Sequence, residues 1–532
     1  MLTTRRTCFL GAALLAVAAS LSVTATAQST TPEAQLLASA AEALGGAERI
    51  RALRTIRLRG YGHEAYQDGG SNITTEPTAP EKMTVVTAYE RVIDLPDGRT
   101  RVTARQSRAF VFAARAMMEG RPVKQSLDGN VAYDTAPDGA TRRVSAEAAA
   151  RRRMELLANP VVAVREALDP RSRLANRRTE GAATLLDVTT AGGEKLTIAF
   201  DRTTNRPAWV RWVSPHENLG EIVLRAEFSA YEPVNGVQLP MSFNTVSDWK
   251  NTVMLRLHVD RYELDVAADD LAAPAAVRAA PEPVPAYRVD AGEVASGIWL
   301  LTGNGGANSV LLEFADHLAL FEVPTSRGWT EALIAKARSL VPGKPLTEAI
   351  ITHHHFDHTG GLRSAIAAGL TIVAQAGNAA WYEELSRRTA ATYPDALSRN
   401  PQPIKLRTFD DHLRLSDSKL TVDLYRIVAN NHIAHGLMGY VPGERLLLQG
   451  DLFDLNWEVY FWGNTYADNV TYRKLDVARD VPIHGRVLPI AEVRAKLVEQ
   501  TANAAALCAR VEAAGLSMPG CPLAWGDTTA QR

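Results

Sequence analysis

The hydrophobic pattern of the chain changes near its middle. In the first half, apolar residues occur in short runs or at every second position, as in Leu255-Arg-Leu-His-Val-Asp-Arg-Tyr-Glu-Leu264. Alternation of this kind gives a β-strand one buried side and one solvent-facing side. The pattern predicts a β-rich domain over residues 28–271, with helices confined to residues 31–44, 47–52 and 144–168.

In the second half, strands alternate with helices. Apolar runs at residues 297–302, 309–313 and 317–322 predict strands, and residues 329–340 predict a helix. The order then repeats, with strands over residues 404–428 and a helix over residues 492–515. Strands followed by helices in two successive halves predict an αββα sandwich, a fold of the α+β class, over residues 287–500. Residues 501–532 are expected to continue as a C-terminal helix and tail.

Two segments lie outside these domains. Residues 272–286 are rich in alanine and proline, which predicts a semi-extended linker. Residues 1–27 combine Arg5-Arg6, an apolar stretch and the small residues Ala25-Thr26-Ala27. This order is typical of a secretory signal peptide that is cleaved after Ala27, so we expect a periplasmic or secreted protein.

The composition narrows the classes of partner. Of the 532 residues, 46% are hydrophobic and 22% are charged, which is typical of a soluble globular protein. The formal net charge of −1 gives no electrostatic argument for binding nucleic acid or an anionic membrane. After residue 27 no apolar run approaches the roughly 18 residues of a membrane span. We therefore expect a small-molecule substrate and no stable membrane insertion.

Two cysteines remain after removal of the predicted signal peptide, which takes Cys8 with it. Cys508 and Cys521 are 13 positions apart. In an exported protein such a pair is expected to form a disulfide. The alternative is a pair of buried free thiols. Neither cysteine lies near a group of possible metal ligands, so a metal-binding role is not expected.

The residues that carry chemistry follow a short apolar run over residues 346–351, which predicts a buried strand. The next residues are His353-His354-His355-Phe356-Asp357-His358. Alternate side chains of extended backbone share one side, so His353, His355 and Asp357 are expected to point together. His358 would follow at the turn, and His354 would point away. Three imidazoles and a carboxylate in this spacing suit a divalent cation such as zinc.

This stretch resembles the His-x-His-x-Asp-His motif of the metallo-β-lactamase-fold hydrolases. The resemblance extends over roughly residues 291–500, where the rest of the family's pattern recurs. His432 precedes Ile-Ala-His-Gly, Asp451 follows an apolar run that ends in glycine, and His484 precedes Gly485. All seven positions at which this family binds metal are therefore occupied by suitable residues.

The resemblance implies two metal ions with a carboxylate between them. The first implied group of ligands is His353, His355 and His432. The second implied group is Asp357, His358 and His484, and Asp451 would bridge the two ions. The implied cofactor is a pair of divalent ions, by default Zn²⁺. A hydroxide that bridges the ions would be the nucleophile, because metal binding lowers the pKa of water towards about 7. Asp357 would help to orient it, so Asp357 and Asp451 are the predicted catalytic residues.

The predicted bridge also bears on the substrate. Members of the family that hydrolyse β-lactams generally carry cysteine or serine where this chain has Asp451. An aspartate is usual in the thioesterase, lactonase, phosphodiesterase and ribonuclease branches. We therefore expect a hydrolase of ester or lactone bonds, with β-lactam hydrolysis as the alternative.

Aromatic residues are concentrated just after Asp451. They include Trp457, Tyr460, Phe461 and Trp462. On a loop over the metals they would form an apolar wall for a hydrophobic substrate. Core packing is the alternative interpretation.

Two runs in the first half, residues 200–209 and 231–240, resemble the half-barrel sheets of periplasmic lipoprotein carriers. This resemblance implies a curved antiparallel sheet that covers an apolar ligand. It leaves a further possibility, a periplasmic carrier of a hydrophobic ligand with a structural metal site. The other interpretation is a scaffold that packs on the catalytic domain.

Overall fold

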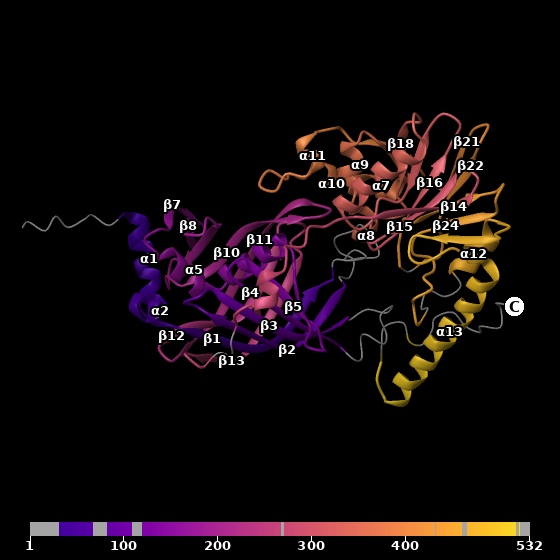
Figure 1. Cartoon of the computed structure of the whole chain (residues 1–532). Helices are drawn as coiled ribbons and strands as arrows, with labels where there is room; N and C mark the ends of the chain where they lie inside the picture. Colours follow the sequence, from indigo (N-terminus) through magenta and orange to yellow (C-terminus); the bar gives the residue numbers. More distant parts are fainter. Residues whose placement is uncertain are drawn as a thin grey trace, which may run out of the picture.

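The computed structural model describes residues 31–66, 82–108, 120–267, 271–430, 432–459, 465–517 and 521. The predicted signal peptide lies outside these residues. The chain forms a first domain dominated by one sheet and a second domain of layered sheets and helices (Figure 1). A long helix, α13 (Ile490–Ala513), projects from the second domain. Among the described helices, none combines the length and the apolar character needed to cross a bilayer.

The first domain is built on a single antiparallel sheet of 13 strands, which confirms the predicted β-rich class. Strands β1 (Thr55–Ala65) and β13 (Val253–Leu264) pair in its middle and join its two halves. On one side of this pair the strands follow outwards in chain order: β2 (Met83–Asp94), β3 (Arg99–Arg108), β4 (Arg121–Asp128), β5 (Val131–Thr135) and β6 (Thr141–Arg143). On the other side they follow outwards in reverse chain order: β12 (Val237–Ser247), β11 (Gly220–Val234), β10 (Pro207–His216), β9 (Lys195–Asp201), β8 (Ala183–Thr189) and β7 (Arg173–Glu180).

Helices of the same domain cover the apolar face of this sheet. They are α1 (Pro32–Ala43), α2 (Ala47–Ala52) and α5 (Pro160–Ala167). Leu37, Ile50 and Val162 from these helices lie in one buried cluster with strand residues such as Ile56 and Phe200. The chain's own helices therefore fill the face on which a carrier would hold its ligand.

The helix predicted over residues 144–168 is in fact two helices, α4 (Ala146–Leu157) and α5. The side chain of Asn159 accepts hydrogen bonds from the backbone N–H groups of Val161 and Val162, at 3.1 and 3.3 Å, and so caps α5. Pro160 takes the first helical position. Proline lacks the N–H that a helix interior requires but suits the first turn, so one helix ends and another begins here.

The segment predicted to be a semi-extended linker is partly helical. Residues Ala275–Ala279 form the short helix α6, in which Val277 is buried against Tyr133. Asp128 accepts a hydrogen bond from the backbone of Ala273 at 2.7 Å and pairs with Arg278. These contacts fix the segment on the surface of the first domain.

The second domain is an αββα sandwich, as predicted. Its seven-stranded sheet runs in chain order from β14 to β20, and its six-stranded sheet runs from β21 to β26. The strands are β14 (Val289–Ala295), β15 (Ile298–Gly303), β16 (Ser309–Glu313), β17 (Leu318–Phe321), β18 (Leu346–Ile350), β19 (Thr371–Gln375), β20 (Lys405–Phe409), β21 (His412–Ser416), β22 (Thr421–Arg426), β23 (Leu437–Val441), β24 (Leu446–Gln449), β25 (Arg479–Pro482) and β26 (Leu488–Pro489).

Three buried clusters hold these layers together. One lies between the two sheets, one between the first sheet and its helices, and one between the second sheet and its helices. The helices of the first sheet are α7 (Arg327–Leu340), α9 (Leu362–Ala367), α10 (Ala379–Arg387) and α11 (Ala396–Arg399), and those of the second sheet are α12 (Thr465–Tyr472) and α13.

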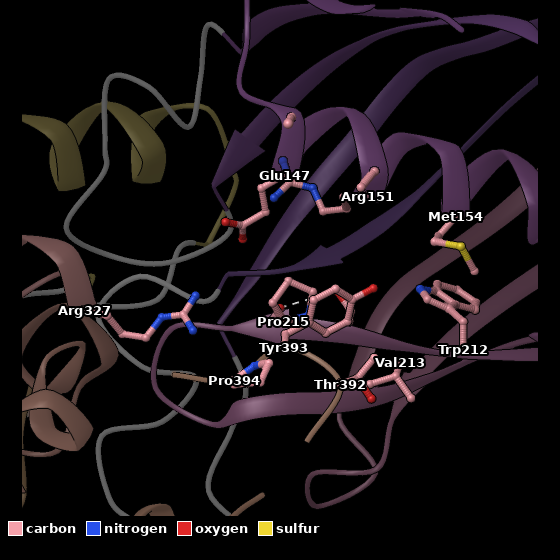
Figure 2. Close-up of a pocket in the computed structure, with 13 residues that line it drawn as sticks. Glu147, Arg151, Met154, Trp212, Val213, Pro215, Arg327, Thr392, Tyr393 and Pro394 are labelled. Atoms are coloured by element: carbon pink, nitrogen blue, oxygen red, sulfur yellow. Dashed lines mark hydrogen bonds between the residues drawn. The ribbon is translucent and has the colours of Figure 1, made fainter. Parts of the chain in front are cut away.

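The two domains meet in a buried interface. Trp249, in the turn between β12 and β13, packs against Phe356 and Trp381 with ring centroids 5.3 and 5.2 Å apart. Arg388 donates to the backbone oxygens of Leu219 and Glu221 at 3.2 and 2.8 Å. Beside these contacts the interface encloses a cavity that is lined from both domains (Figure 2).

Candidate metal centre

Strand ends in the second domain bring the seven predicted ligands together. The cluster from residue 353 to residue 358 follows β18, Asp451 follows β24, His484 follows β25, and His432 lies between β22 and β23. In each of two groups, one potential ligand atom per residue lies within 4.8 Å of the others. The groups are the predicted ones, and they share Asp451: His353, His355, His432 and Asp451; and Asp357, His358, Asp451 and His484.

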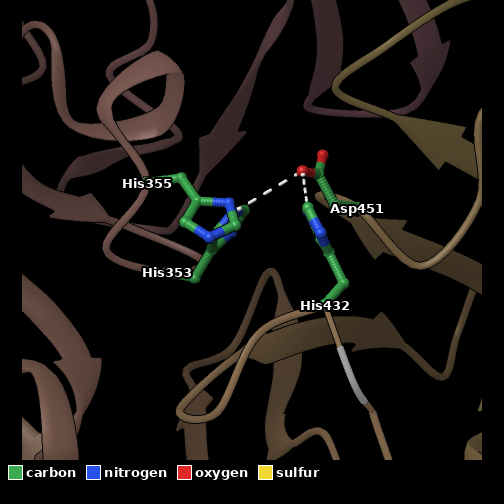
Figure 3. A group of neighbouring side chains, drawn as sticks. All are labelled: His353, His355, His432 and Asp451. Atoms are coloured by element: carbon green, nitrogen blue, oxygen red, sulfur yellow. Dashed lines mark hydrogen bonds and ion pairs between the residues drawn. The ribbon is translucent and has the colours of Figure 1, made fainter. Parts of the chain in front are cut away.

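The first group is almost fully buried. Asp451 Oδ2 lies 2.8 Å from His432 Nε2 and 3.6 Å from His353 Nε2 (Figure 3). The rings of His353 and His355 have centroids 4.5 Å apart. No member of this group is more than 5% exposed. The four side chains thus converge on one small volume.

The second group uses the other oxygen of the same carboxylate. Asp451 Oδ1 lies 3.1 Å from His358 Nε2 and 3.3 Å from His484 Nε2. Asp357 Oδ2 lies 3.8 and 3.9 Å from the same two nitrogens. Asp451 therefore stands between the two groups, in the position expected of a bridge.

The backbone of the histidine cluster differs in part from the prediction. We expected extended backbone through Asp357, but a one-turn helix, α8 (Phe356–Thr359), begins directly after His355. The backbone N–H groups of His358 and Thr359 donate to the oxygen of His355 at 3.1 and 3.0 Å. The turn directs Asp357 and His358 to the second group, while His353 and His355 face the first.

Two glycines allow the close packing behind this turn. A Cβ at Gly360 would lie 2.3 Å from the backbone oxygen of Thr325, and one at Gly361 would lie 1.8 Å from Thr330 Oγ1. Such distances exclude a larger residue without rearrangement. His354 points away from the metal groups, as predicted, and its ring contacts Trp381 with centroids 5.5 Å apart.

Residues behind the ligands orient the imidazole rings. Glu322 is fully buried, and its Oε1 accepts a hydrogen bond from the backbone of Thr352 at 2.7 Å. Its Oε2 lies 3.4 Å from His358 Nδ1, and Thr352 Oγ1 lies 2.9 Å from His353 Nδ1. These contacts leave the Nε2 atoms directed at the centre. Sequence reasoning missed Glu322, although an acidic residue just after an apolar strand was available as a signal.

The first domain contributes a charge to the centre. Lys82 precedes β2, its backbone oxygen accepts from the N–H of Tyr66 at 3.0 Å, and it is only 8% exposed. Burial lowers the pKa of Lys82 to about 8, although the carboxylates of Asp357 and Asp451 oppose that effect. Its charge helps to lower the pKa of His355 and of His432. A single lysine so far upstream carries no motif, so the sequence offered no signal for it.

The electrostatics of the groups suit a divalent cation. Burial lowers the pKa of His353, His355 and His432, which keeps their imidazoles neutral and able to donate a lone pair. Burial raises the pKa of Asp451, but the facing His358 outweighs this effect and holds the pKa of this carboxyl well below its usual value. Among the described residues, His353 Nε2 is a buried polar atom without a hydrogen-bond partner. In the first group, neutral imidazoles beside an ionised carboxylate are the donors that a zinc-type ion takes. In the second group Asp451 outweighs burial and raises the pKa of His358 and His484, so an ion bound there would displace protons from these rings.

The predicted aromatic wall is only partly described. Trp457 packs against the buried cluster beneath α13, and its backbone oxygen accepts from Gln500 Nε2 at 2.7 Å. Tyr460, Phe461 and Trp462 lie outside the described residues. A wall at this place stays a prediction.

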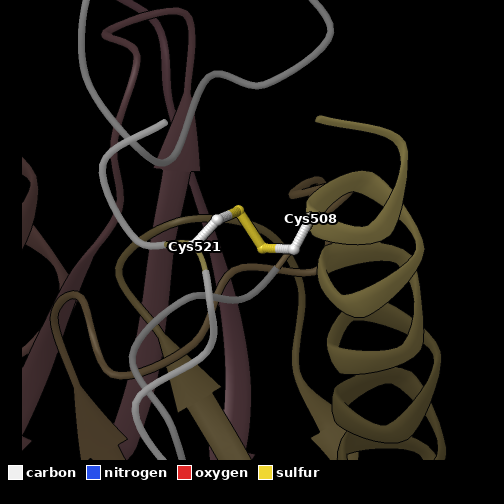
Figure 4. Close-up of a disulfide and its surroundings, with 2 residues drawn as sticks. All are labelled: Cys508 and Cys521. Atoms are coloured by element: carbon white, nitrogen blue, oxygen red, sulfur yellow. A yellow bond between two sulfur atoms is a disulfide. The ribbon is translucent and has the colours of Figure 1, made fainter. Parts of the chain in front are cut away.

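The predicted disulfide is present. Cys508, on α13, is bonded to Cys521 with a Cα–Cα distance of 5.2 Å (Figure 4). The bond ties the segment after α13 back onto that helix. Neither cysteine is a member of the metal groups.

The chain matches the metallo-beta-lactamase superfamily over residues 302–462. Solved structures with similarity include DIM-1 metallo-beta-lactamase, with 19% identity, coverage of 41% of this chain and 98% of that chain, and a TM-score of 0.31. A metallo-beta-lactamase from Pontibacter korlensis has 16% identity, coverage of 40% and 97%, and a TM-score of 0.32. The Flv1 flavodiiron core from Synechocystis sp. PCC6803 has 14% identity, coverage of 44% and 71%, and a TM-score of 0.34. The comparison with curated proteins yields no match.

Proposed function

We propose that this protein is an exported metallo-hydrolase that cleaves ester or lactone bonds. It would use two divalent ions, by default Zn²⁺, in its second domain, which matches the metallo-beta-lactamase superfamily. The observation that carries the proposal is the position of Asp451. One of its oxygens faces His432 and His353, and the other faces His358 and His484. Because each oxygen of Asp451 faces a different group of ligands, the carboxylate can bind one metal ion with each oxygen.

The chain's residues divide the work around such ions. Divalent ions in a site of this kind act as Lewis acids and make a nucleophile available at neutral pH. Asp451 stays ionised because His358 lies beside it. Asp357 has a buried Oδ1 without a hydrogen-bond partner among the described residues, and it lines a cavity. Asp357 can therefore hold or orient a proton next to the reacting atoms.

Three observations favour this proposal over its alternatives. An aspartate at position 451 stands where β-lactam hydrolases generally carry cysteine or serine. The disulfide between Cys508 and Cys521 supports export, because disulfides persist in oxidising compartments. Helices α1, α2 and α5 occupy the apolar face of the first sheet, which argues against a carrier of apolar ligands.

The test is turnover of a substrate panel by the zinc-loaded protein and by Asp451→Asn. The panel holds an aryl ester, a lactone, a thioester, a phosphodiester and a chromogenic β-lactam. We expect turnover of the ester or the lactone, at least about a thousandfold lower in the variant, together with loss of one metal equivalent. Turnover of the β-lactam alone, or ester turnover that survives in Asp451→Asn, would refute the proposal.

Asp480→Asn is the matched control. Asp480 is a fully buried carboxyl on β25, which pairs with β24, the strand that leads to Asp451. It belongs to neither metal group. Burial raises its pKa to about 7, so about half of these carboxyls are already uncharged at neutral pH and an amide changes the charge less than at an ordinary aspartate. We expect this variant to keep its metal and its turnover.

A further inference from the structure

The metal centre opens into a cavity between the two domains. This cavity has a volume of about 580 Å³ and is lined by Asp357 and His484 of the second metal group. Its other walls come largely from the first domain, including Glu147 and Arg151 of α4 and Pro215 of β10. A molecule that reaches the metals from this side therefore touches both domains.

A second cavity, of about 510 Å³, adjoins the first. The two share Glu147, Arg151 and Pro215 as lining residues, so they meet at this point. Glu147 and Arg151 face Pro215 and Tyr393 across the second cavity (Figure 2). The two cavities together form one continuous cleft, which we call the interdomain cleft.

The far part of the interdomain cleft is mainly apolar. Its apolar lining residues are Ala146, Ala150 and Met154 of α4, Trp212, Val213 and Pro215 of β10, and Tyr393 and Pro394 of the second domain. The two cations in its lining already have carboxylate partners. Arg327 Nε lies 3.1 Å from Glu217, and Arg151 Nε lies 3.9 Å from Glu155. The carboxylate of Glu147 also lines this part, at the point where the two cavities meet. Beyond Glu147 the lining therefore favours an uncharged apolar group.

Hydrogen bonds across the interface fix the walls of the interdomain cleft. The carboxylate of Glu221 accepts from the backbone N–H groups of Thr392 and Tyr393 at 2.8 and 3.3 Å. The backbone N–H of Arg327 donates to Glu217 at 3.0 Å. The space between the domains is thus a formed site and does not depend on loose docking.

We propose that the interdomain cleft binds the substrate, with the scissile bond at Asp357 and His484 and an uncharged apolar arm between α4, β10 and Tyr393. This inference rests on the proposed hydrolase function and names its substrate class, esters or lactones with a medium-length apolar arm. It also gives the first domain a role in specificity. Each methylene buried in such a cleft improves binding roughly fourfold.

The test uses a variant that fills the cleft without removing a core residue. Ala150 is exposed on α4 and lines the apolar part. Ala150→Trp is compared with Ala335→Trp, which places the same side chain at an exposed position on α7 that lines a separate cavity. The second variant is Tyr393→Ser, which removes an aromatic side chain from the apolar wall. Tyr393 lies on a loop and is 37% exposed.

Rates are measured on p-nitrophenyl esters with two, six and eight acyl carbons. In the parent we expect kcat/KM to rise with chain length. Ala150→Trp should lose at least tenfold on the eight-carbon ester and less than twofold on acetate, and Ala335→Trp should match the parent. An unchanged chain-length dependence in both Ala150→Trp and Tyr393→Ser would overturn the inference.

Binding of N-phenyl-1-naphthylamine, a neutral fluorescent probe, separates this inference from the proposed function. If no ester is hydrolysed, the proposed function fails. Probe binding that weakens at least tenfold in Ala150→Trp and not in Ala335→Trp then still supports an apolar site in the cleft. Equal probe binding by all variants would overturn it.

Discussion

The side-chain amide of Asn218, in the first domain, donates a hydrogen bond to the backbone oxygen of Phe356, 2.9 Å away. It also donates to Thr359 Oγ1 at 2.8 Å. Both bonds are buried, and Phe356 stands between the metal-group residues His355 and Asp357. The first domain thus helps to hold the turn that presents the predicted ligands.

Asn218→Ala should weaken metal binding. The change leaves the Phe356 carbonyl buried without its donor, which costs about 1–3 kcal/mol. We expect affinity for zinc to fall about tenfold at one of two sites, measured by competition with a chromophoric chelator. Asn503→Ala is the control, because Asn503 is exposed and also donates to a backbone oxygen, that of Glu458. Equal zinc affinity in Asn218→Ala and the parent would contradict the role assigned to Asn218.

Glu322→Gln should also lower metal affinity, by about 10- to 100-fold. A glutamine can still accept from the backbone of Thr352, but it no longer places a negative charge 3.4 Å from His358 Nδ1. Glu348→Gln, at a partly buried residue on β18 of the same sheet, tests whether loss of another carboxylate has this effect. Isothermal titration with zinc measures both variants, and similar losses in the two would show that the change at Glu322 is not specific.

Lys82→Met should separate metal binding from turnover. The buried ammonium repels a cation, so its removal should leave zinc affinity unchanged or higher. The same ammonium can stabilise negative charge that develops on a carbonyl oxygen, so kcat should fall about 10- to 100-fold. Lys82→Arg should retain part of the activity. Lys124→Met, at an exposed lysine of the same sheet, is the control. An unchanged kcat in Lys82→Met would exclude a catalytic contribution.

His216 should make the stability of the domain interface depend on pH. Its Nδ1 accepts from the backbone N–H groups of Asn218 and Leu219 at 3.2 and 3.3 Å, and a protonated ring can accept neither bond, because both of its nitrogens then carry hydrogen. Burial, with help from Arg388 and Arg327, lowers the pKa of His216 to about 4. The unfolded chain takes up this proton near pH 6.5 and the folded chain only near pH 4. The stability from the neutral ring is therefore complete above about pH 6.5 and is lost as the pH falls towards 4.

His216→Asn isolates this effect from that of the buried metal-group histidines. An asparagine oxygen can accept the same two hydrogen bonds but does not titrate. Between pH 6.5 and 4 the unfolding free energy of the parent should fall more steeply than that of the variant, by up to about 1.4 kcal/mol per pH unit. Urea unfolding of the metal-free proteins across this range measures the difference. Parallel curves would show that His216 does not contribute.

The sequence was sufficient for the class of the second domain and for its seven candidate ligands. Strand and helix periods identified the sandwich, because each period marks which side of an element is buried. The ligands were implied by the resemblance to the metallo-β-lactamase-fold hydrolases, whose short motif matches His353 to His358 and whose later positions match His432, Asp451 and His484. The same reasoning from periods predicted one helix over residues 144–168. It did not recognise that Asn159-Pro160 ends one helix and begins the next.

Only the tertiary structure decided how the two domains share the site. Lys82, Asn218 and Arg151 carry no motif, and each stands far along the chain from the ligands it approaches. Their proximity to the metal centre depends on how β1–β13 and α4 dock against α8 and α10, which local periodicity does not encode. A metal motif is legible in sequence because its chemistry demands particular residue types at close spacing. A substrate cleft between domains is set by packing, which many residue types satisfy and which becomes visible only once the chain is folded.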